Sequence, residues 1–125
     1  MNLAFPLILA GLMGAIGVIL AAAGAHIVPG TGVDGAAYIL LFHAAAELAA
    51  ISLLQHRLLS RTLAIVALTA WPLGAALFAG DIVLRAFSGH HLFPMAAPAG
   101  GTILIAAWLA LTAAAASAYT QRADS

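Results

Sequence analysis

The sequence has no cysteine and no lysine, and only 6% of its 125 residues are charged. Without cysteine the chain has no disulfide, thiolate metal ligand, iron–sulfur cluster or cysteine nucleophile. A formal net charge of zero and the lack of lysine leave no basic surface, so we exclude nucleic acid as a partner. Soluble domains carry about 25% charged residues, and this chain has too few to make a hydrated surface. The composition therefore indicates a protein that lies in a lipid bilayer.

The hydrophobic residues, 65% of the chain, are concentrated in four long runs. A helix needs about 20 apolar residues to cross about 30 Å of hydrocarbon. The first run is not preceded by Lys or Arg and is too long for the apolar part of a secretion signal, so it also reads as a span. We predict an all-α, integral membrane four-helix bundle, with one domain over residues 1–125. The expected helices are residues 3–25, 36–54, 62–87 and 102–119.

The four arginines predict the orientation of these spans. Arg57, Arg61 and Arg122 fall on the side that also holds both termini, and only Arg85 falls on the other. Because cytoplasmic segments carry the excess of Lys and Arg, both termini are expected to be cytoplasmic. Rows of small residues in the first and last runs indicate close helix packing. They also indicate association with a second copy or with a larger membrane complex.

Two polar residues, His43 and Glu47, lie four positions apart inside the second apolar run. In a helix this spacing places both side chains on one face. Asp81 and Arg85 have the same spacing near the end of the third run. Ionisable side chains in a membrane turn inward, away from lipid. We therefore expect a cluster in the outer half of the bundle, which His90 and His91 could cover from the following loop: His26, His43, Glu47, Asp81 and Arg85.

Three interpretations of this cluster stay open. In the first, His43 pairs with Glu47 and Asp81 pairs with Arg85, so that the charges within each pair cancel. In the second, imidazoles and carboxylates bind a transition metal ion, zinc, iron, copper or manganese, although no tight motif such as HExxH is present. In the third, the cluster handles protons or binds a small polar ligand. The metal ligands would be His26, His43, Glu47 and Asp81; the ligand or proton site would be His43, Glu47, Asp81 and Arg85.

The serines have no paired base within sequence reach, and no glycine-rich phosphate loop follows a strand. We therefore expect a non-enzymatic membrane protein without catalytic residues. The first expectation is a binding or accessory module that holds a metal ion or small polar ligand. The alternatives are a carrier subunit for protons, ions or small solutes that uses Glu47 and Asp81, and a purely structural subunit with internally paired charges.

Short pieces along the chain resemble the YgdD-like small inner-membrane proteins, a bacterial family of unknown function with four predicted spans. The resemblance implies a multi-pass protein of the bacterial inner membrane, with His26 and His43 as family-type positions and no settled activity. In that family the positions of Glu47, Asp81 and Arg85 are usually apolar or small, so the charges are an addition in this chain. The matching pieces are Gly24-Ala25-His26, Tyr38 with Phe42-His43-Ala44, Leu77-Phe78-Ala79-Gly80, and Pro98-Ala99-Gly100-Gly101 leading into Trp108.

Overall fold

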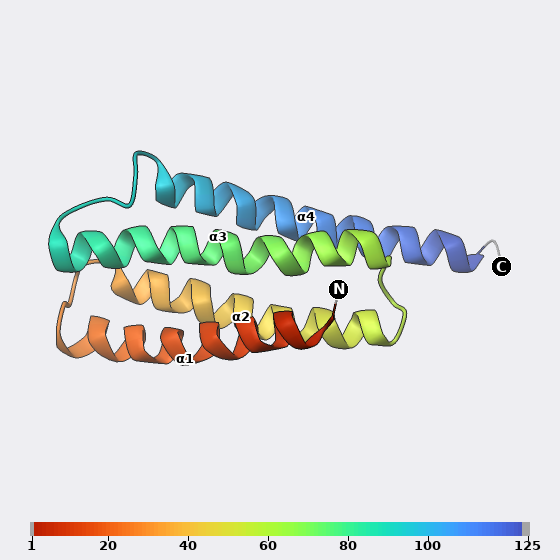
Figure 1. Cartoon of the computed structure of the whole chain (residues 1–125), viewed down its shortest axis with the longest axis horizontal. Coiled ribbons are helices and arrows are strands. Elements are labelled where there is room, and N and C mark those ends of the chain that lie inside the picture. Colours follow the sequence, from red (N-terminus) through yellow and green to blue (C-terminus); the bar gives the residue numbers. More distant parts are fainter. Residues whose placement is uncertain (1, 124–125) are drawn as a thin grey trace.

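The computed structural model describes residues 2–123 of the chain, which form antiparallel helices lying side by side (Figure 1). Each helix is long and apolar enough to cross a membrane. The prediction of an all-α fold with four such helices is confirmed, and the arrangement fits a small multi-pass membrane protein. The helices are α1 (Ala4–His26), α2 (Val33–Gln55), α3 (Arg61–Ser88) and α4 (Ala96–Ala123).

The two ends of the molecule carry different connections (Figure 1). The α1–α2 and α3–α4 connections lie together at one end, which we call the loop end. The α2–α3 connection lies at the other end, together with the start of α1 and the end of α4, and we call this the termini end. At the termini end, the Ser60 amide donates to the Ala114 carbonyl at 2.9 Å and Arg122 donates to the Arg57 carbonyl. These bonds attach α4 to the α2–α3 connection.

The helices pack as two hairpins, α1 on α2 and α3 on α4. The hairpins meet mainly where α2 packs on α3, whereas α1 touches α3 over a short stretch. Among the described helices, α4 makes no close backbone contact with α1 or α2. Leu68 and Trp71 of α3 are buried at the centre of this arrangement. The interior of the protein therefore lies around α3.

Two helices begin earlier than the sequence predicted. α4 begins at Ala96 rather than near residue 102, because Pro98 falls in its first turn, where the missing proline N–H costs no helical bond. α2 begins at Val33 after Gly32, whose φ of 85° is readily adopted by glycine. Asp34 then lies in the first turn of α2, where a negative charge is favourable. α3 runs unbroken through Pro72.

The backbones of α3 and α4 approach each other closely at Gly74 and Gly100. A Cβ atom built on Gly100 would lie 2.6 Å from the Phe78 amide nitrogen and 2.7 Å from the Gly74 carbonyl oxygen. Both atoms belong to the backbone, so neither can turn away. The predicted row of small residues on α4 contributes only in part to helix packing. Ala114 of this row is buried, whereas Ala106 is exposed. Helix packing here depends on glycine, as expected where lipid gives no hydrophobic drive.

Replacing Gly100 by Ala should separate α3 from α4. The added methyl would press on backbone atoms, and we expect the free energy of unfolding in detergent to fall by about 1–3 kcal/mol. Gly101→Ala is the matched control, because its Cβ would lie 3.8 Å from the nearest atom, the Phe78 ring. Denaturation followed by circular dichroism measures both variants. Equal stability of the two variants would contradict the assigned crossing point.

Candidate functional site

Four side chains from three helices form what we call the interior group: His43 and Glu47 of α2, Trp71 of α3 and Trp108 of α4. The first three are buried, whereas Trp108 lies at the edge of the group and is 43% exposed. The His43 Nδ1–H donates to the Ile39 carbonyl at 2.7 Å, and His43 Nε2 accepts the Trp108 indole N–H at 3.1 Å. These two bonds fix a neutral imidazole with its proton on Nδ1. The ring centroids of His43 lie 6.2 Å from Trp71 and 6.0 Å from Trp108, and the two indoles lie 4.8 Å apart.

Glu47 follows His43 by one helical turn and is 0% exposed. Neither of its carboxyl oxygens has a hydrogen-bond partner in the described part of the chain, and the same is true of the Trp71 indole nitrogen. The expected pairing of His43 with Glu47 is not observed, because the bonds of both His43 nitrogens go to Ile39 and Trp108. An unpartnered buried carboxyl is rare and costly. Glu47 is therefore the feature of the interior group that most requires an explanation.

A second group, which we call the loop-end group, forms around Asp81 of α3. The Asp81 side chain is 2% exposed and accepts the Leu92 amide at 2.9 Å and the His91 Nδ1 at 3.2 Å. Arg85, one turn further along α3, places its Nε 3.8 Å from the same carboxylate. Two of these donors come from the connection before α4. Asp81 thus attaches the α3–α4 connection to α3.

The structure separates the residues that the sequence placed in one cluster. His43 and Glu47 lie in the interior group, Asp81 and Arg85 in the loop-end group, and His26 is exposed at the end of α1. Among the residues that the structure describes, no three His, Asp or Glu side chains form a group that could hold a metal ion. The proposed ligands His26, His43, Glu47 and Asp81 are therefore not assembled as a shell. His90 and His91 are both exposed, but only His91 contacts Asp81.

Sequence reasoning missed two contributors, Trp108 and the Leu92 amide. Trp108 reads as a packing residue because no charged residue or histidine lies near it in the sequence. Its indole N–H reaches His43 from a position 65 residues away. The Leu92 amide could not be found from side-chain types, since it is a backbone donor in a connection. The sequence did predict that His91 lies near the cluster, and the spacing of Asp81 and Arg85 predicted their contact.

One cavity belongs to the loop-end group. It has a volume of about 290 Å³ and lies between Asp81, Arg85 and His91 on one side and residues 95–98, the start of α4, on the other. We call it the loop-end pocket. Its charged lining distinguishes it from a packing defect, which is apolar.

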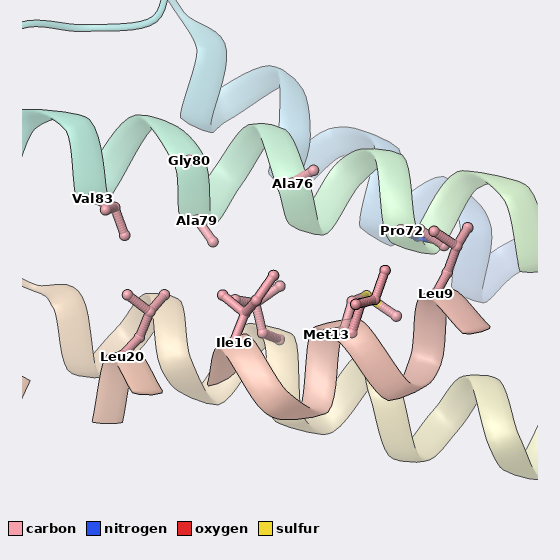
Figure 2. A pocket seen from close by; sticks show the side chains of 11 residues that line it. Leu9, Met13, Ile16, Leu20, Pro72, Ala76, Ala79, Gly80 and Val83 are labelled. Atoms are coloured by element: carbon pink, nitrogen blue, oxygen red, sulfur yellow. The ribbon is translucent and has the colours of Figure 1, made fainter. Parts of the chain in front are cut away.

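A larger cavity of about 380 Å³ is a groove between α1 and α3. Figure 2 shows long side chains of α1 directed toward α3. No titratable side chain lines this groove, so it offers nothing that would orient a polar ligand. Its existence follows from a mismatch in size between the long side chains Met13, Ile16 and Leu20 and the small α3 residues Ala76, Ala79 and Gly80.

Fold and sites together define a small helical protein of membrane-spanning dimensions with two separate polar groups, each of which contains one buried carboxyl. The chain belongs to the family described as protein of unknown function (DUF423), whose model matches residues 20–101. The match covers His43, Glu47, Asp81 and Arg85, and it ends before Trp108. Comparison with curated proteins and with solved structures finds no match. The finer resemblance to YgdD-like proteins stays a prediction.

The attachment of the α3–α4 connection can be tested with Asp81→Asn. The amide has lost one acceptor oxygen and the charge that strengthens the bonds from Leu92 and His91. We expect hydrogen exchange at the Leu92 amide to speed up by roughly tenfold. Asp34→Asn is the control, because Asp34 lies at the same end on α2 and has no part in this contact. An unchanged exchange rate at Leu92 in Asp81→Asn would show that Asp81 does not hold the connection.

Proposed function

We propose that this protein is an integral membrane proton-binding module in which Glu47 is the group that binds the proton. The observation that carries the proposal is a fully buried carboxyl whose two oxygens lack any hydrogen-bond partner among the described residues. A carboxylate in such a place costs far more than a neutral acid, because nothing replaces its hydration. Ionisable groups at membrane depth are retained mainly where they serve a function.

Glu47 has no basic partner among the described residues, so a proton is the simplest way to neutralise its carboxyl group. His43 is the other titratable side chain of the interior group, and both its nitrogens are already engaged while the ring is neutral. Arg85 is committed to Asp81 at the loop end. No basic side chain of the described chain therefore pairs with Glu47. A proton neutralises the carboxyl without requiring any further ligand.

Trp71 supplies a donor for the other state of the site. Its indole N–H is buried in the same group and has no acceptor in the described structure. If Glu47 releases its proton, this unused N–H is a candidate donor for the carboxylate, provided that a side-chain rearrangement brings the two groups together. Proton release would then change the environment of the indoles. The site contains its own optical reporter, since Trp71 and Trp108 are the two tryptophans of the sequence.

The proposed setting is the cytoplasmic membrane of a bacterium, with both termini in the cytoplasm. Three of the four arginines lie toward the termini end, in agreement with the excess of positive charge on cytoplasmic segments. Glu47 does not line either cavity described above. A carrier that uses Glu47 would therefore need a conformational change that opens a path to this side chain.

Tryptophan fluorescence tests the proposal. For protein in phosphatidylcholine vesicles, we expect emission to change with pH in one step between about pH 4 and about pH 9. The change should disappear in Glu47→Gln, which keeps the shape of the side chain and cannot ionise. A step that persists in Glu47→Gln would show that another group causes the change and would contradict the proposal. Emission that does not depend on pH in the wild type would also contradict it.

Asp81→Asn is the matched control for this experiment. It makes the same acid-to-amide change in a second buried carboxyl that lies outside the interior group. We expect it to keep the fluorescence step. Proton uptake into vesicles with an imposed pH gradient then separates a carrier from a protein that only binds. A carrier shows a leak that Glu47→Gln abolishes and Asp81→Asn retains.

A further inference from the structure

The loop-end pocket contains hydrogen-bond donors that the protein does not use. Its buried member, Asp81, is already satisfied by the Leu92 amide and by His91. Its other two polar members are exposed, because the Arg85 side chain is 47% exposed and that of His91 is 56% exposed. A ligand that approaches the pocket therefore meets donors first and the carboxylate last.

Arg85 contacts Asp81 through Nε alone, at 3.8 Å, which is an ion pair rather than a hydrogen bond. Its two terminal nitrogens have no hydrogen-bond partner in the part of the chain that the structure describes. The guanidinium is a planar fork that matches two oxygens of a phosphate or carboxylate. His91 uses Nδ1 for Asp81, so its Nε2 is a second donor whenever the ring is protonated. The Arg85 guanidinium and the His91 Nε2 are therefore suited to bind an oxyanion.

The depth of the pocket fits the same ligand. Arg85 lies one turn before Ser88, the last residue of α3, or about 5 Å from the helix end at ~1.5 Å per residue. If α3 spans the bilayer, this is the level of the lipid head groups. The volume of about 290 Å³ is at the lower limit for ligand sites, which suits one compact polar group rather than a large molecule.

We propose that the loop-end pocket binds a phosphate group, held by the Arg85 guanidinium and by His91. The phosphate can belong to an anionic lipid head group or to a free phosphate ion, and the chemistry of recognition is the same. The site is separate from the interior group, and its test does not depend on proton binding at Glu47.

The experiment follows the His91 imidazole and Arg85 Nε signals by nitrogen-15 NMR of the full chain. One arm titrates inorganic phosphate into detergent-solubilised protein. The other compares protein in phosphatidylcholine discs with protein in discs that also contain phosphatidylglycerol. We expect a saturable shift of both signals. A response in both arms supports a general phosphate site, a response to phosphatidylglycerol alone supports a lipid site, and a response to inorganic phosphate alone supports a free-ion site.

Two variants and one control make the test specific. Arg85→Gln should weaken the affinity for phosphate, measured from the shift of the His91 signal, by roughly tenfold or more. The reason is that the planar guanidinium and its charge are both lost. Arg85→Lys keeps the charge beside Asp81 and should weaken the affinity severalfold, since an ammonium group cannot bind two oxygens in one plane. Arg61→Gln, at the opposite end of the same helix, should leave the response unchanged. Absence of a response in both arms, or an equal response in Arg85→Gln, would overturn the proposal.

Discussion

The close contact of α3 with α4 at Gly74 and Gly100 is the constraint on which both polar groups depend. Because the backbones meet there, the helices on either side stay near enough for Trp71 and Trp108 to lie 4.8 Å apart. From that position Trp108 can reach His43, although α4 has no backbone contact with α2. The same contact sets the first turn of α4 beside Arg85, where it forms one wall of the loop-end pocket.

The three buried ionisable side chains are stabilised in different ways. His43 stays neutral and uses both ring nitrogens, one toward a backbone carbonyl and one toward an indole. Asp81 collects donors from a connection and from its own helix. Glu47 has no partner among the described residues. The difference follows from location, since a connection has free amides to donate, whereas the amides of helix interiors are already bonded to carbonyls.

The helices could be predicted from the sequence, because four long apolar runs are typical of helices of membrane-spanning length. The Asp81–Arg85 contact could also be predicted, because a spacing of four residues places both side chains on one face of a helix. The same spacing was misleading for His43 and Glu47. Helical side chains lean toward the N-terminus, and the His43 ring accordingly bonds to the Ile39 carbonyl, away from Glu47. The His43–Trp108 bond could not be found, since it depends on how two hairpins are placed and not on any local pattern.

The division into two hairpins has a consequence for how the chain is assembled. A protein is made from its N-terminus, so α1 and α2 exist before α3 and α4 are complete. During that interval the part of α2 that packs on α3 is not yet covered, and the indole that later binds His43 has not yet been made. Docking of the second hairpin is therefore what gives His43 its indole partner. A fragment that ends after Gln55 would lack both tryptophans, and His43 Nε2 would lose the donor that it has in the full chain.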